Sequence, residues 1–337
     1  MRKTAFLSSV LILFQIFALE FGTGDQYSQT FVGVINAQDM NSSPARPPAR
    51  REARGFRLAA VGINESTPEP DLVSDPAVEE AGTKSEYEEK LRGYTQKIED
   101  YRRAHDVYRV TRAQYIRSKT QKAKTDAKGS TIKLLELRDD VIISYLKVLK
   151  ARLSETEGVS DARFEGLAFK IDEEIFWYER HRNLVASAGS LEDLVDDSDE
   201  AKDRQKITER LYYEVLSNIS YGKVSNYKER LKENLESLRE KVDEIRVDER
   251  VGFSFSNRKM QVLDRWIFEA ENLIIRTQDK QEETDDAIND MLQNKRQLNK
   301  VKPYNEIMEV LSDGKQFLKE ASSYLIEVIK EIKIAEY

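Results

Sequence analysis

The chain has 337 residues, of which 34% are charged and 39% are hydrophobic, and its formal net charge is −7 at pH 7. It contains no cysteine, which excludes a thiol nucleophile, a thiolate metal site, a disulfide and a lipid-modified cysteine. A negative net charge suits nucleic acid poorly, because affinity for nucleic acid comes largely from neutralising phosphates. Charges of both signs at this density are typical of long helices with wide solvated faces.

Residues 1–37 have the form of an export signal. A short basic start, Arg2 and Lys3, precedes the mostly apolar stretch 5–19. This stretch is shorter than the roughly 20 residues that a membrane-spanning helix requires. We expect a signal peptide that is cleaved near residue 24 or residue 37, where small residues occur. The alternative is that the segment is retained as an N-terminal membrane anchor.

Residues 38–79 are predicted to be a disordered linker. Six of the seven prolines lie before residue 77, and proline interrupts helices by removing an amide donor. The low apolar content leaves too little surface to bury in a core. An arginine group precedes an acidic stretch, and its members are Arg46, Arg50, Arg51, Arg54 and Arg57. We expect a solvated tether; the alternative is contact between these arginines and a membrane surface or an acidic envelope polymer.

Residues 80–337 are predicted to form about six helices and no strand. The junctions are marked by Gly129, Gly158, Gly189, Gly252 and Pro303, because glycine ends helices and proline suits a first helical turn. The predicted helices are 83–127, 130–156, 160–188, 199–249, 256–301 and 303–335. The fold class is all-α: an elongated antiparallel helical bundle with a coiled-coil-like arm. Residues 80–188 and 189–337 form either two units of three helices or one continuous bundle.

A ladder of tyrosines occupies every seventh position of the first predicted helix. Its members are Tyr87, Tyr94, Tyr101, Tyr108 and Tyr115. A seven-residue repeat keeps one stripe facing a neighbouring helix, so the ladder is interpreted first as a packing seam. The alternative is an interaction stripe that stacks on sugars or holds a partner helix. Because the first predicted helix outruns the second and third, we also expect self-association through the remaining seam.

The second and third predicted helices are the most apolar. Apolar side chains surround most of the second helix between Leu134 and Leu153, so we expect it to be central. In the third helix a stripe of Phe164, Leu167, Ile171, Ile175 and Tyr178 is widened by Phe169, Phe176 and Trp177. We therefore expect the third helix to be the second member of the core.

No residue pattern indicates a catalytic, metal or cofactor site. Arg102 and Tyr178 stand three positions before the two histidines, His105 and His181, so the Glu-x-x-His pairs of a carboxylate-bridged metal bundle are missing. The acidic run 193–203 lacks the glycine and the closing glutamate of a calcium loop, and it suits the start of a helix. Phosphate-binding loops, dinucleotide-binding glycine motifs and nucleophile elbows do not occur. We expect a protein that is not an enzyme and that holds no metal or cofactor.

The sequence predicts an exported helical scaffold, spacer or protein-interaction module of the cell envelope or the extracellular space. Its expected partner is another protein or a second copy of the chain. The alternative is a membrane-tethered ligand-binding or sensing domain, anchored by residues 1–37, with a pocket lined by Trp177, Trp266 and neighbouring tyrosines. The two hypotheses differ in the fate of the leader and in the placement of the tryptophans.

Overall fold

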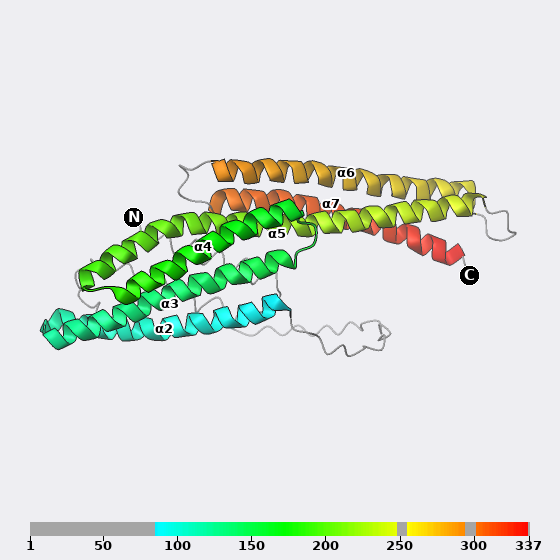
Figure 1. Ribbon diagram of the computed structural model, residues 1–337. Helices are drawn as coiled ribbons and strands as arrows, with labels where there is room; N and C mark the ends of the chain where they lie inside the picture. The colour runs from blue at the N-terminus through cyan, green and yellow to red at the C-terminus, as the bar shows by residue number, and fades with distance from the viewer. Residues whose placement is uncertain (1–84, 248–254, 294–300, 336–337) are drawn as a thin grey trace, which may run out of the picture. The chain divides into compact units, whose positions relative to one another are not determined.

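The computed structural model describes residues 85–247, 255–293 and 301–335. About 94% of the described residues lie in six helices and none lies in a strand (Figure 1). The prediction of an all-α helical bundle is therefore confirmed. The segments predicted as leader (1–37) and linker (38–79) lie outside the described residues.

The helices are α2 (Glu86–Ser118), α3 (Gln121–Ser154), α4 (Asp161–Ser187), α5 (Leu191–Val247), α6 (Asn257–Gln293) and α7 (Val301–Ala335). They belong to one compact unit, Ser85–Tyr337. Within this unit α2 and α3 form an antiparallel hairpin, α4 packs on α3, and α6 and α7 form a second hairpin (Figure 1). The 57-residue α5 contacts α3, α4, α6 and α7. Its first half meets His181 of α4 through the Asp197 carbonyl and Tyr304 of α7 through Tyr213, and its second half meets α6 through the ion pair of Arg239 and Glu271.

The junction between the first two helices lies earlier than predicted, because threonine and lysine make it instead of glycine. Lys119 adopts the left-handed conformation with φ 51°, and the Thr120 side chain accepts a hydrogen bond from the backbone N–H of Ala123 at 3.2 Å. Gly129, the predicted terminator, lies inside α3. As a result α2 has 33 residues and α3 has 34. The expected overhang of the first helix is not present among the described residues.

The junctions around α4 lie where glycines were predicted to mark them. Gly158 has φ +83°, and a Cβ added to it would lie 2.2 Å from the carbonyl oxygen of Gly222 in α5. Only glycine allows so close an approach of two backbones. After Gly189, the carboxylate of Asp193 accepts hydrogen bonds from two backbone N–H groups and the Ser190 hydroxyl accepts one from Asp193. This capping starts α5 at Leu191, earlier than the predicted residue 199.

The later junctions are described only in part. Pro303 lies in the first turn of α7, as predicted. Gly252 lies outside the described residues. No helix within the described ranges combines the length and the apolarity that crossing a bilayer requires.

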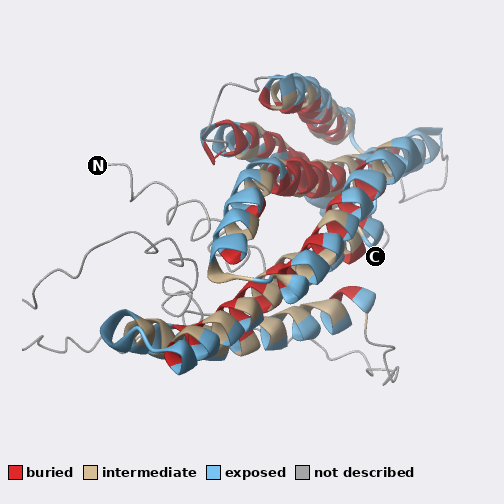
Figure 2. Ribbon diagram, turned by 60° about the vertical axis from the view of Figure 1, so that its left-hand side comes forward, coloured by how far each residue is buried: buried red, intermediate tan, exposed pale blue. Residues whose placement is uncertain are grey.

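The buried residues, red in Figure 2, lie mainly on the sides on which the helices face one another. The second predicted helix, α3, is central as expected, because it contacts α2, α4 and α5. The third, α4, buries Leu167, Ile171 and Tyr178. The expectation that Phe169 and Phe176 widen this buried stripe is wrong, since each is 65% exposed. They lie on the side of α4 that faces away from α3 and α5.

Candidate functional site

The most unusual feature of the described core is a group of polar side chains buried between α3, α4 and α5. Asp139 is 0% exposed, His181 1% and Glu174 5%. Burying a charge costs several kcal/mol unless the charge is paired and hydrogen-bonded. We call the group the buried polar cluster; its members are Arg138, Asp139, Glu174, Tyr178, His181, Arg204 and Thr208, with the backbone carbonyl of Asp197.

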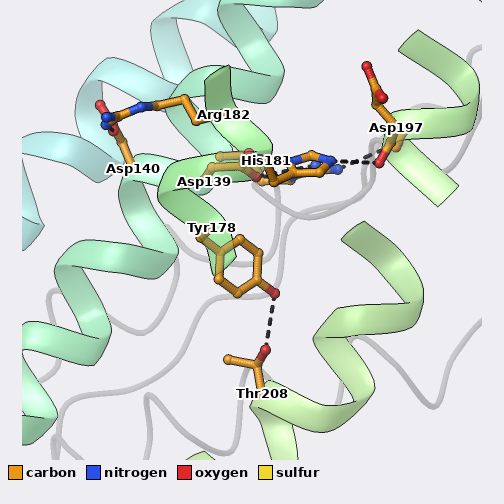
Figure 3. Close-up of polar contacts among 9 residues, drawn as sticks. Asp139, Asp140, Tyr178, His181, Arg182, Asp197 and Thr208 are labelled. Atoms are coloured by element: carbon orange, nitrogen blue, oxygen red, sulfur yellow. Dashed lines mark hydrogen bonds and ion pairs between the residues drawn. The ribbon is translucent and has the colours of Figure 1, made fainter. Parts of the chain in front are cut away.

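His181 lies at the centre of the buried polar cluster and joins three helices (Figure 3). Its Nδ1 is 2.6 Å from the carboxylate of Asp139 in α3, and its Nε2 is 2.9 Å from the carbonyl oxygen of Asp197 in α5. Because both partners are acceptors, both ring nitrogens donate and the ring is an imidazolium. Burial lowers the pKa of His181, but the hydrogen bond and charge of Asp139 and the Asp197 carbonyl outweigh it, so the pKa lies above its usual value.

A second group of contacts in the buried polar cluster joins α4 to α5. Glu174 accepts hydrogen bonds from the Arg204 guanidinium at 2.6 Å and 3.1 Å and from the Thr208 hydroxyl at 2.8 Å. Since the Thr208 hydroxyl has one proton, the Tyr178 hydroxyl donates to Thr208, 3.1 Å away (Figure 3). Burial raises the pKa of Tyr178, which keeps this donor protonated. The buried carboxylate of Glu174 is thus compensated by one cation and one hydroxyl.

Trp177 connects the two groups of contacts. Its ring stacks on the His181 ring with centroids 5.0 Å apart and an interplanar angle of 12°. The guanidinium of Arg204 lies 5.4 Å from the centroid of the same tryptophan. Two cationic groups therefore lie against one indole, an arrangement that contributes roughly 0.5–2 kcal/mol for each cation.

Asp140, next to Asp139, extends the contacts toward α2. It accepts a hydrogen bond from Lys97 of α2 at 2.9 Å. It accepts another from Arg182 of α4, which lies beside it in Figure 3. Burial raises the pKa of Asp140, but the two donors and their charges outweigh it and hold the pKa below its usual value. Two adjacent aspartates of α3 thus fix the positions of α2, α4 and α5.

The geometry of the buried polar cluster fits a structural role. In a catalytic histidine–carboxylate pair, Nε2 is free to take a proton from a nucleophile. Here Nε2 already donates to the Asp197 carbonyl, and His181 is almost fully buried. Within the described ranges no group of three or more histidine, aspartate or glutamate side chains is arranged to hold a metal ion. The contacts of the cluster link α3, α4 and α5 to one another.

The tyrosine ladder runs along the side of α2 that faces α3. Tyr87, Tyr101 and Tyr108 are buried, whereas Tyr94 and Tyr115 are half-buried. The Tyr94 ring lies 5.3 Å from the ring of Tyr145 in α3, and Tyr145 makes an edge contact with Tyr212 in α5 at 4.9 Å. These contacts agree with a packing seam, and the use of the ladder as an interaction stripe stays a prediction.

The remaining residues predicted to be functional lie apart from one another. Trp266 of α6 packs against a core cluster that contains Val242 and Leu263, so the structure does not bring it to Trp177. His105 is half-buried between Tyr101 and Tyr108 on α2. The arginines of segment 46–57 lie outside the described residues.

One cleft of about 230 Å³ lies where the end of α3 meets the middle of α5. It is lined by Arg152, Glu155, Thr156, Glu157, Lys223, Asn226, Tyr227 and Arg230. Glu157 accepts a hydrogen bond from Asn226, and Glu155 accepts one from the backbone N–H of Tyr87. Neither tryptophan lines this cleft, and its mixture of acidic and basic side chains selects no ligand charge.

Sequence reasoning missed the buried polar cluster. The available signal was Asp139, a carboxylate inside the most apolar helix, together with His181 in the next helix. A buried carboxylate needs a partner on a neighbouring helix, and a histidine is one of the few side chains that can serve. Spacing along one chain does not say which residues meet across two helices.

Comparisons with protein-family models, with curated proteins and with solved structures give no match to this chain.

Proposed function

We propose that this chain is an exported, non-enzymatic helical scaffold or protein-interaction module of the cell envelope or the extracellular space. The observation that supports the proposal is the outward side of α4, where Phe169 and Phe176 are each 65% exposed. Large aromatic side chains aligned on an exposed helix are typical of contact surfaces, because they bury much area at a small cost in side-chain entropy.

The contacts on the inward side of α4 suit a role as a contact surface. Glu174, Tyr178 and His181 fix the inward side of the helix through the buried polar cluster. A contact surface gains affinity when it is rigid before binding, since less conformational entropy is lost on association. The cluster thus contributes to recognition by holding the two phenylalanines in place.

The export part of the proposal rests on the sequence of residues 1–37, with its basic start and short apolar stretch. Its test is the intact mass of the native protein, measured separately in the soluble, membrane and extracellular fractions. We expect a mature N-terminus near residue 25 or residue 38 outside the cytoplasm. A full-length mass in the soluble fraction, which holds the cytoplasm, would overturn the proposal. A full-length mass confined to the membrane would favour the tethered alternative.

A further inference from the structure

We infer that the outward side of α4 is the interface of an antiparallel homodimer. The inference rests on the proposed function, because it names the partner of the surface that the proposal describes. We call this surface the α4 face; its residues are Phe169, Glu173, Phe176, Arg180 and Leu184. A second copy of the chain places a complementary side chain opposite each of these residues. No single neighbouring helix of the same chain does this.

The α4 face is a continuous stripe that is open to a partner. Its members follow one another at steps of four, three, four and four residues, which places them on one side of a helix. Phe169, Phe176 and Leu184 are exposed by 65%, 65% and 49%. Glu173 and Arg180 between them are also exposed. The stripe therefore alternates apolar and charged groups along α4.

The charges on the α4 face differ from those beside it. On the flanks, Asp172 pairs with Lys150 of α3 and Lys170 pairs with Glu214 of α5. No residue among those that the structure describes forms an ion pair with Glu173 or Arg180 on the face itself. Seven residues separate these two, about 10 Å along the axis, so they do not pair with each other within one helix. The guanidinium of Arg180 lies 6.0 Å from the centroid of the Phe176 ring, and both charges stay exposed and open to an ion pair with a second molecule.

An antiparallel second copy supplies these partners when the twofold axis passes between positions 176 and 177. Glu173 then faces Arg180 of the second copy, and by symmetry Arg180 faces Glu173. Phe169 faces Leu184 of the second copy, and the two Phe176 rings meet at the axis. Five side chains of each copy thus form two apolar contacts, two ion pairs and one aromatic pair. Such reciprocal contacts are what the isologous geometry of a twofold dimer requires.

Other arrangements of two α4 helices bring like charges together. In a parallel pair, Glu173 meets Glu173 and Arg180 meets Arg180. In an antiparallel pair with the axis between positions 172 and 173, Phe169 meets Phe176, but Asp172 and Glu173 of both copies gather at the axis. Like charges that face each other at an interface disfavour association, so charge selects the first arrangement. Because five side chains make a small interface, we expect a reversible dimer with a Kd on the order of tens of micromolar.

The orientation can be tested by disulfide cross-linking, because the chain has no cysteine of its own. Phe176→Cys places a thiol at the twofold axis, and Phe169→Cys is the matched control with the same residue type, helix and exposure. In the inferred dimer the two 169 positions lie about 22 Å apart along the axis, beyond the reach of a disulfide. Under mild oxidation of the exported chain, we expect covalent dimers for Phe176→Cys only. Equal cross-linking of both variants, or of neither, would overturn the inference.

The register can be tested by charge reversal. Sedimentation equilibrium from 1 to 300 μM should show a dimer for the unmodified chain. Glu173→Arg alone and Arg180→Glu alone should each weaken association at least tenfold, because each creates two like-charge contacts across the axis. The double variant should restore association. Since positions 173 and 180 do not meet within one chain, only an antiparallel partner explains such a restoration.

Two readouts separate the outcomes. Helicity and the thermal midpoint should be equal in all four proteins, since both residues are exposed. If the double reversal fails to restore the dimer, or if the unmodified chain is a monomer at 300 μM, the homodimer is wrong while the export proposal stands. If the intact mass places the chain in the cytoplasm, the export proposal fails while the dimer is unaffected.

Discussion

The two halves of α5 are held by different chemistry. The first half meets α3 and α4 through the buried polar cluster, in which Asp139, Glu174 and His181 are buried. The second half meets α6 and α7 through a cluster of aliphatic side chains, which are Val242, Ile245, Leu263, Ile267, Val328 and Ile332. Both halves contain aliphatic packing, since Leu194 of the first half packs with Leu135 and Val185, but the buried carboxylates and the buried histidine lie against the first half.

Because of this difference, one half of α5 contributes mainly to the specificity of the helix packing and the other mainly to the stability of the fold. Aliphatic packing stabilises in proportion to the area removed from water and depends weakly on which neighbour supplies the area. A buried ion pair adds little net free energy, because desolvation offsets the attraction, but it strongly penalises any arrangement that leaves one charge alone. The polar contacts of the first half of α5 therefore specify which residues face α4, and the aliphatic cluster of the second half stabilises through the apolar area that it buries.

The strongest test of the charged half is His181→Leu. The substitution leaves Asp139 buried without its 2.6 Å donor, and it leaves the Asp197 carbonyl without its side-chain partner. We expect the free energy of unfolding to fall by about 3–5 kcal/mol, measured by urea denaturation. The double variant Asp139→Leu/His181→Leu should lose less than this, because it leaves no buried carboxylate that depends on the 3.3 Å contacts of Arg138 alone.

An exposed ion pair on the same two helices gives the matched control for this test. Lys150 and Asp172 are 2.7 Å apart, with 37% and 55% of their side chains exposed. Lys150→Leu should change the free energy of unfolding by about 1 kcal/mol or less. Equal effects for Lys150→Leu and His181→Leu would show that burial does not distinguish the two pairs, and the comparison would fail.

A cavity in the aliphatic cluster at the second half of α5 should lower the free energy of unfolding. Leu263 of α6 is 0% exposed and belongs to the core cluster that α5, α6 and α7 share. Leu263→Ala should lower the free energy of unfolding by about 2–5 kcal/mol, since it removes buried apolar area and leaves a void. The loss should be the same at pH 6 and pH 8, because no titratable group takes part. A loss that changes with pH would contradict this description of the second half.

The pH dependence of stability should come from the charged half. Burial lowers the folded-state pKa of His181, but Asp139 and the Asp197 carbonyl outweigh it and hold the pKa above the ordinary value of 6.5. Its contribution is therefore fully present below pH 6.5 and is lost as the pH rises through the folded-state pKa. The free energy of unfolding should fall there by at most about 1.4 kcal/mol per pH unit.

The other histidine provides the control with the opposite sign. Burial and the nearby Arg109 hold the pKa of His105 below 6.5, so its charging opposes folding at low pH and this penalty is relieved as the pH rises. His105→Gln should keep the fall in stability above pH 6.5, and His181→Gln should abolish it. Urea denaturation at steps of half a pH unit measures both slopes. A fall that persists in His181→Gln would assign the titration to another group.

The helices and their number could be predicted, because glycine, serine and proline punctuate a strong helical pattern. The buried and exposed sides of the helices were harder to predict. Phe169 was assigned to the core of α4, yet it follows the buried Leu167 by two residues, about 200° around the helix. Its exposure could have been found from that spacing. The pairing of Asp139 with His181 could not have been found from the sequence, because it depends on the relative rotation of α3 and α4.

The first helix junction shows where local signals compete. Gly129 was expected to end a helix, but the chain turns at Lys119 and Thr120 instead. Lysine seldom adopts the left-handed conformation, so its position gave no signal. Thr120 caps the start of α3 by accepting a hydrogen bond from the backbone N–H of Ala123. The resulting helix keeps Gly129 as an interior residue.

That interior glycine gives the smallest predicted effect, with the opposite sign to the others. A Cβ added to Gly129 meets nothing within 4 Å, and the residue is exposed on α3. Gly129→Ala should therefore raise the free energy of unfolding by about 0.5–1 kcal/mol, because alanine loses less backbone entropy on entering a helix. Gly158→Ala is the contrasting variant, since φ +83° and the nearby Gly222 carbonyl exclude a Cβ. Urea denaturation should show stabilisation at position 129 and destabilisation at position 158; destabilisation at both would mean that the chain needs a flexible residue at 129 after all.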